Sequence, residues 1–236
     1  MLGVTRRLWI SGTLCMTLLV LTACGNSEAD QRKAFTEFLQ TRILDRKGAR
    51  VPQLTEENKK AFGDYAAHYA VITGFHDQMN ASVGPGISKV LAAGSITSVG
   101  QVVSRKDDIV TARQTLVSLR TTLDTALADA EKAHAALRQP TDLKIVYDKA
   151  FEKVVTLPTN AFRDIWPAVD ATFEDIIKFA DFLSANSGKI KLNGPIAEVS
   201  DPKLLAQVNA QVAAMQKHSG DIQQAQRKLR EVMYGD

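Results

Sequence analysis

The sequence has very little cysteine, which removes several kinds of chemistry. Only Cys15 and Cys24 occur in 236 residues. Both lie within or directly after an apolar N-terminal run, so the chain beyond Cys24 has no free thiol and can form no disulfide. Thiolate catalysis and cysteine metal sites are therefore excluded there. The fold has to be stabilised by its hydrophobic core.

Recognisable catalytic motifs are also lacking. The chain has no Gly-x-Ser-x-Gly elbow, no Gly-x-Gly-x-x-Gly loop and no P-loop. Its adjacent carboxylate pairs are Glu56/Glu57, Asp107/Asp108 and Glu174/Asp175. Neighbours on a helix point about 100° apart, so these pairs do not act as an acid and a base on one substrate. We expect a protein that is not an enzyme, and an enzyme without a recognisable motif is the weakest alternative.

A strong net charge is the third absence. The full chain carries 29 basic and 26 acidic residues. Two of the basic residues, Arg6 and Arg7, belong to the N-terminal run, which has no acid, so 27 basic residues face 26 acidic ones beyond it. A net charge near +1 gives no electrostatic basis for binding nucleic acid, and we expect no such partner.

An export signal occupies the N-terminus. Arg6 and Arg7 precede an apolar run over residues 8–21, and the run ends in Leu21-Thr22-Ala23-Cys24. An aliphatic residue, two small residues and a cysteine form the lipobox pattern of bacterial lipoproteins. The run is shorter than the ~18 residues of a membrane-spanning helix. Cys24 is therefore predicted to be lipidated and to begin the mature chain. The alternatives are an uncleaved anchor and a soluble secretory signal with an incidental Cys24.

The lipobox also predicts how the protein is attached and where. Several acyl chains on one cysteine form a stable anchor, at about 0.8 kcal/mol per buried CH₂. In bacterial lipoproteins that this chain resembles, aspartate after the cysteine retains the protein in the inner membrane. Here the residue is Gly25, which predicts the outer membrane, on its periplasmic face, with the inner membrane as the alternative. The predicted organisation is a signal peptide at 1–23, a lipidated tether at 24–30 and one helical domain at 31–236.

Apolar residues recur at spacings of three and four through most of the mature chain, which predicts helices. Capping residues and prolines mark the breaks. The predicted helices run approximately over residues 27–47, 55–84, 87–93, 96–103, 107–138, 142–157, 160–187 and 201–234. A kink is expected at Pro167. Residues 189–200 are predicted to form a loop, in which Ile190 and Leu192 fit a lone short strand without a visible partner.

The longest predicted helix, at residues 107–138, carries a sustained heptad seam. Its apolar positions are Ile109, Ala112, Leu116, Leu119, Leu123, Ala126, Ala130, Ala133 and Leu137. We expect the helices that begin at Asn160 and Asp201 to cover this seam, which gives an all-α fold, an antiparallel helical bundle with long heptad-patterned helices. An intermolecular coiled coil is the alternative, and we favour a monomer.

Residues 83–103 are apolar but consist mainly of small residues, with Lys89 as the only charge. One interpretation is a connecting segment packed into the core. The other is a surface that contacts lipid or a protein partner in the envelope. The candidate contact residues are Ile87, Val90, Leu91, Ile96 and Val99.

Histidines supply the remaining candidates for chemistry. Glu131 and His134 have the Glu-x-x-His spacing of ferritin-like di-metal bundles. Those sites need two further glutamates and a second Glu-x-x-His pair, and the chain has no second pair. His68 and His76 lie two turns apart on one predicted helix, where a shared ligand would need help from another element. We expect no metal site and no cofactor.

The start of the mature chain, with QRKAFTEFLQTRIL at residues 31–44, resembles the YiaF-type lipoproteins of enteric bacteria. The resemblance extends over essentially the whole mature chain and supports the envelope location. It implies no biochemical activity, and Cys24 is the only functional residue that it transfers. Two functions remain open: a non-enzymatic binding or adaptor protein of the envelope, and a carrier of an apolar ligand or lipid in a groove between helices. A deep apolar cavity would favour the carrier.

Replacing Cys24 tests the lipobox. Cys24→Ser should abolish lipidation and leave uncleaved precursor in the inner membrane, because the serine hydroxyl does not replace the thiol as the acylated group. Cys15→Ser, inside the signal, is the matched control and should be processed normally. Membrane fractionation and metabolic labelling with an acyl precursor measure both. Normal processing and membrane attachment of the Cys24 variant would show that the lipobox interpretation is wrong.

Overall fold

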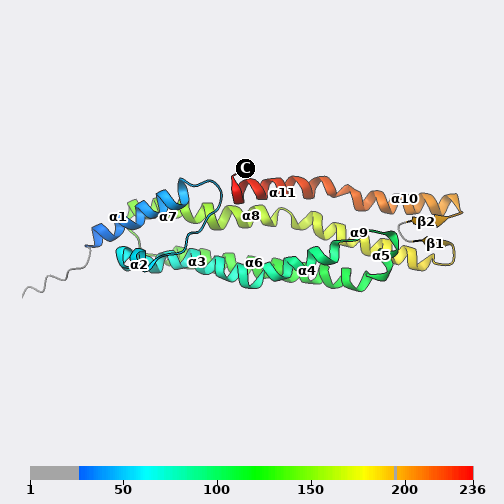
Figure 1. Ribbon diagram of the computed structural model, residues 1–236, viewed down its shortest axis with the longest axis horizontal. Helices are drawn as coiled ribbons and strands as arrows, with labels where there is room; N and C mark the ends of the chain where they lie inside the picture. The colour runs from blue at the N-terminus through cyan, green and yellow to red at the C-terminus, as the bar shows by residue number, and fades with distance from the viewer. Residues whose placement is uncertain (1–26, 194–195, 236) are drawn as a thin grey trace, which may run out of the picture.

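The structure is a computed structural model that describes residues 27–193 and 196–235. The helices lie side by side along a long, narrow body (Figure 1). Cys24 and Gly25, with the predicted signal, lie outside the described residues. Within the described part, no helix combines the length and the apolar character needed to cross a membrane.

The first helix starts where its sequence predicts. α1 (Glu28–Leu39) begins at a capping box, in which the Asp30 N–H donates to Ser27 Oγ at 3.2 Å and the Ser27 N–H donates to the Asp30 carboxylate at 3.3 Å. It continues into a π-helical turn, η1 (Gln40–Leu44). The predicted tether at 24–30 is therefore too long at its end, because residues 28–30 already belong to α1.

The second predicted helix is divided in two. α2 (Glu56–Phe62) and α3 (Tyr65–Ser82) are separated at Gly63, whose φ is +54°. A Cβ at this position would lie 2.3 Å from the side-chain oxygen of Gln31 on α1. Glycine thus permits both the left-handed backbone and the close approach of the chain to α1. After α3 come the short helices α4 (Gly84–Gly94) and α5 (Val99–Ser104).

The long heptad helix is present as α6 (Lys106–Ala136), 31 residues in length. Its predicted seam is buried within the chain from Ile109 to Ala130, whereas Ala133 near its end is exposed. Of the two helices predicted to cover this seam, one does so and the other does not. α9 (Trp166–Ala185) does pack on α6, but α3 and α4 cover the rest of the seam. The C-terminal helices pack on α8 and α9 instead.

The predicted helix stop at Pro158 is wrong. α7 (Thr141–Phe151) passes through a π-helical turn, η2 (Glu152–Thr156), into α8 (Leu157–Arg163). The Leu157 N–H reaches back five residues to the carbonyl of Glu152, so the backbone accommodates a proline that has no N–H to donate. Thr159 Oγ1 donates to the Val155 carbonyl at 2.7 Å. The break expected near Pro167 does occur, between α8 and α9.

The last third of the chain corrects two further predictions. Residues predicted as a lone strand pair as an antiparallel hairpin, β1 (Ile190–Asn193) with β2 (Ile196–Val199). The final helix is two helices, α10 (Pro202–Lys217) and α11 (Ser219–Tyr234), which meet at His218. On α10, Leu204 is buried whereas Leu205 is 41% exposed. The all-α fold class is confirmed, with this small hairpin as an addition.

Three tiers of helices make up the body (Figure 1). A central rod of α7, η2, α8 and α9 runs along it. α2, α3, α4 and α6 lie along one side of the rod, and the α11–α10 pair lies along the other. α1 packs on α2, α3 and α7 at one end of the body. Buried side chains form three apolar clusters spaced along the length, centred on α1 with α3 and α7, on α6 with α4 and α9, and on α9 with α10.

Leu119 tests the role of the α6 seam. It is 6% exposed, and a Cβ on Gly86 of α4 would lie 2.5 Å from its Cδ2 atom. Leu119→Ala should therefore lower the free energy of unfolding by about 2–5 kcal/mol through lost burial and a cavity. Val117→Ala, at a 58% exposed position on the same helix, should stay within about 0.5 kcal/mol.

Denaturant titration followed by circular dichroism measures both variants. Unfolding should also be independent of protein concentration, because the seam is buried inside one chain. A midpoint that rises with protein concentration would place the seam in an interface between copies.

Candidate functional site

An apolar groove lies between α3 and α11 and is the largest hollow described on the molecule. It has a volume of about 650 Å³, within the range of roughly 300–1,000 Å³ that small-molecule sites occupy. α8 forms its floor, with one contribution from α6. The lining consists of Phe75, His76, Met79, Asn80, Val83, Gly84, Ile87, Leu123, Pro158, Thr159, Phe162, Gln226, Leu229, Arg230, Met233 and Tyr234.

Two helical stripes form the walls of the groove. On α3 the stripe is His76, Met79 and Asn80, continued by Val83 at the end of the helix. On α11 it is Gln226, Leu229, Arg230 and Met233. Both repeat at spacings of three and four, so each stripe occupies one face of its helix. α3 packs on α6 and α11 packs on α8. The two stripes consequently face each other across the floor without closing on it.

The groove is apolar in its depth and polar at its rim. Phe75, Val83 and Leu123 are at most 6% exposed, and Thr159 is buried with its hydroxyl bonded to Val155 of its own helix. Asn80, Gln226 and Arg230 are exposed. Met79 and Met233 add two flexible thioether side chains, which adapt to ligands of different shape. A ligand here would place apolar surface inward and a polar group outward.

His76 contributes no charge at neutral pH. Its Nε2 lies 2.8 Å from the Val154 carbonyl, and since a carbonyl only accepts, Nε2 donates the hydrogen. Burial lowers the pKa of His76 below its ordinary value, because the charged imidazolium would lose hydration. Arg230 is thus the one lining side chain that is charged at neutral pH.

The end of α11 is fixed to the chain between α1 and α2. The Ala49 N–H donates to the Met233 carbonyl at 3.2 Å. Gly48, with a φ of +68°, is so close that a Cβ there would lie 2.3 Å from the same carbonyl oxygen. Lys228 forms an ion pair with Asp164 beside α8. These contacts hold α11 at the rim although only Ala225 of this helix is buried.

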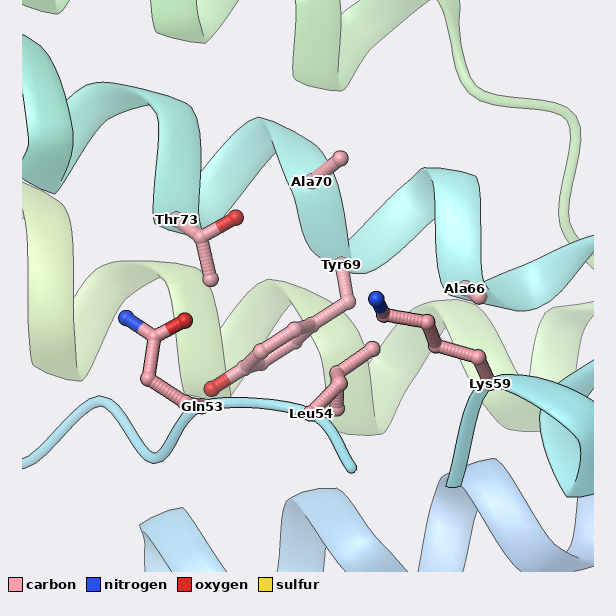
Figure 2. Close-up of a pocket in the computed structure, with 7 residues that line it drawn as sticks. All are labelled: Gln53, Leu54, Lys59, Ala66, Tyr69, Ala70 and Thr73. Carbon is pink, nitrogen blue, oxygen red and sulfur yellow. The ribbon is translucent and has the colours of Figure 1, made fainter. Parts of the chain in front are cut away.

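A second hollow, lined by residues from 53 to 73, is a poorer candidate. Figure 2 shows the Tyr69 ring directed from α3 toward the segment that carries Gln53 and Leu54. The hollow has a volume of about 210 Å³. The Tyr69 hydroxyl donates to the Pro52 carbonyl at 2.7 Å, and burial strongly raises the Tyr69 pKa. This hydrogen bond fixes the segment against α3, so we assign the hollow a structural role.

The candidate contact patch from the sequence does not form one exposed surface. Val90 is buried against α6, and Ile87 lines the groove. Ile96 and Val99 are half-buried and pack against the cluster around α9 and α10. Leu91 alone is largely exposed, at 66%. Within residues 83–103, Val83, Val90 and Val102 are buried, because α4 lies along α6 and α5 packs on α9.

The histidines considered as ligands are held separately by other partners. His134 Nε2 lies 2.8 Å from Asp148, which also binds Lys144. His68 Nδ1 is 3.1 Å from the Gln139 amide, far along α3 from the His76 contact. No cluster of three or more His, Cys, Asp or Glu side chains suited to a metal is found among residues 27–193 and 196–235.

The groove between α3 and α11 was not predicted from the sequence. Its signal was the α11 stripe, in which Gln226, Leu229, Arg230 and Met233 share one helix face. The helix that begins at Asp201 was expected to cover the α6 seam, and nothing in the periodicity showed that the face of its second half would lie opposite α3.

Comparison with known proteins identifies relatives of the chain. A family model described as "Protein of unknown function (DUF3053)" matches residues 12–230. Relatives include "Uncharacterized protein YiaF" from Escherichia coli (strain K12) and from Shigella flexneri, each 33% identical over 184 residues that make up 77% of this chain and 78% of the relative. No solved structure has significant similarity to the chain. The resemblance inferred from the mature N-terminus is confirmed.

The buried His76 predicts a pH dependence of stability. Its pKa is lowered in the folded state and returns to about 6.5 on unfolding, so below that pH the unfolded chain binds a proton that the folded chain does not. Stability should fall as pH drops from 7 to 5. His76→Gln, which keeps an N–H donor for the Val154 carbonyl, should reduce this loss.

Urea unfolding at several pH values measures the dependence. At pH 7 the two proteins should differ little, which serves as the internal control. An unchanged pH slope in the variant would contradict the assignment to His76. His68→Gln separates the remaining contribution, since burial lowers the pKa of His68 as well.

Proposed function

The chain belongs to the DUF3053 family, and we propose that it is a lipid-anchored, non-enzymatic protein of the cell envelope that holds an apolar ligand in the groove between α3 and α11. The proposal joins two parts of the molecule. The lipobox at Cys24 and the following Gly25 favour attachment to the outer membrane, with the protein facing the periplasm. The groove supplies the site for the ligand.

The observation that carries the proposal is the groove's combination of size, apolar lining and open rim. About 650 Å³ of space remains between two helix stripes that would bury more apolar surface if they met. α3 and α11 are each tied to other helices, so the space is maintained by the fold. An occupant with apolar surface would gain burial there that the side chains do not supply to each other.

Features of the lining support binding without catalysis. The groove has no carboxylate, cysteine or serine, and its threonine bonds to its own helix. His76, the one titratable imidazole, is committed to a backbone carbonyl. These side chains do not form the pair of nucleophile and base, or of acid and base, that a hydrolytic site requires.

Ligand binding takes precedence over the adaptor role because of where the apolar surface lies. The adaptor was expected to use Ile87, Val90, Leu91, Ile96 and Val99, but Val90 is buried, Ile96 and Val99 are half-buried, and only Leu91 is largely exposed. A partner in the envelope remains compatible with a carrier, since a carrier has to deliver its ligand. The anchor keeps the molecule at one membrane while the groove stays open to the aqueous phase.

Blocking the groove tests the proposal. The mature lipoprotein is anchored in phosphatidylcholine vesicles and exposed to a photoreactive dodecanol, and labelled peptides are mapped by mass spectrometry. Labels should fall on peptides of α3, α8 and α11. Leu229→Glu should reduce this labelling about tenfold, because an apolar chain would have to displace water from a carboxylate.

Leu205→Glu is the matched control, since Leu205 is exposed on α10 and lies outside the groove. It should label as the wild type does. Circular dichroism of both variants verifies that the helices are retained. Labelling spread evenly over the surface, or equal effects of the two substitutions, would refute a ligand site in the groove.

A further inference from the structure

We propose that the ligand of the groove is an amphiphile with one acyl chain and an anionic head group, a long-chain fatty acid, whose carboxylate is bound by Arg230. This inference rests on the proposed function and specifies its ligand. It follows from the distribution of charge and polarity around the groove.

Arg230 is a cation at the rim of a site that contains no anion. Across the described residues, 27–193 and 196–235, no carboxylate lies within ion-pair distance of it. The nearby Lys228 forms an ion pair with Asp164. Glu231, which follows Arg230 in the chain, lines a different hollow together with Lys149 and Lys153. The charge that the rim offers to a ligand is therefore positive.

Hydrogen-bonding groups accompany the guanidinium. Gln226 lies one turn before Arg230 on α11, Tyr234 lies one turn after it, and Asn80 belongs to the facing wall on α3. Amide N–H and phenol O–H groups donate to a carboxylate as the guanidinium does. A guanidinium binds a carboxylate through two parallel N–H bonds, which fixes the head group in one orientation.

The depth of the groove selects the other half of the ligand. Phe75, Val83, Leu123 and Phe162 supply apolar surface without a charge. His76 Nε2 and Thr159 Oγ1 are hydrogen-bonded to backbone carbonyls. The volume matches one small ligand. A fatty acid would bury its acyl chain in the apolar depth and place its carboxylate beside Arg230 at the rim. A cationic head group in the same position would be repelled by Arg230.

Three photoreactive C12 amphiphiles separate the contributions of chain and head group. Dodecanoate, dodecanol and dodecyltrimethylammonium, each with the same diazirine-bearing chain, are added to the mature lipoprotein anchored in phosphatidylcholine vesicles. Groove labelling is measured against concentration, below the critical micelle concentration of each. Dodecanoate should reach half-maximal labelling at a concentration at least tenfold lower than dodecanol does. Dodecyltrimethylammonium should need a higher concentration than dodecanol.

Two arginines on α11 provide the variants. Arg230→Gln should remove the preference for dodecanoate and leave dodecanol labelling unchanged, because only the head-group contact is lost. Arg227→Gln removes the same charge from the same helix outside the groove lining and should keep the preference. Both positions are exposed, so the fold is retained in each variant.

The outcomes distinguish this inference from the proposed function. Equal labelling by the three amphiphiles, or equal loss in both arginine variants, would overturn the anionic head group while leaving an apolar ligand in the groove. Absence of groove labelling by every amphiphile would overturn the inference and the proposed function together. A preference for dodecyltrimethylammonium would assign the rim to a cationic ligand and refute the role of Arg230.

Discussion

Burial of the α6 seam positions the helices on which the groove depends. The seam from Ile109 to Ala130 packs against α3, α4 and α9. At about 25 cal/mol per Å² of apolar area, this contact is a main source of stability in a described body without cysteine. α3 and the central rod are thereby held at a fixed separation. α11, which packs on α8, completes the groove at a distance from α3 that α6 determines.

Polar contacts add specificity around this apolar seam. Arg113 on α6 binds Asp170 through Nε at 2.7 Å and Glu174 through Nη2 at 3.2 Å, both on α9. The hydrogen bond from Arg113 holds the pKa of Asp170 below its ordinary value. All three side chains are about a third exposed or more, so solvent screens the attraction and its stabilisation is modest. Their main effect is to fix the register of α9 along α6.

Several features of the fold were open to sequence reasoning and several were not. The helix starts after Ser27 and Thr55 and the seam of α6 are local patterns, and they appear as expected. The break at Gly63, the π-helical turn before Pro158 and the β1–β2 hairpin were missed. The break at Gly63 depends on a contact with a distant segment, Gln31 on α1. The strand β2, which pairs with β1, is too short and too exposed to be recognised alone.

The sequence by itself determined the lipobox pattern at Cys24, the helical class and the identity of the apolar face on each long helix, because these depend on spacing along one segment. Tertiary structure alone decided which faces meet. The stripe on α11 was compatible with the α6 seam, yet α3 and α4 occupy that seam and leave the α11 face on the rim of a groove. Periodicity identifies the apolar face of a helix but not the helix against which that face packs. The pairing depends on how all the apolar faces of the chain pack together. A site between two faces that do not pack on each other can therefore be recognised only in the folded structure.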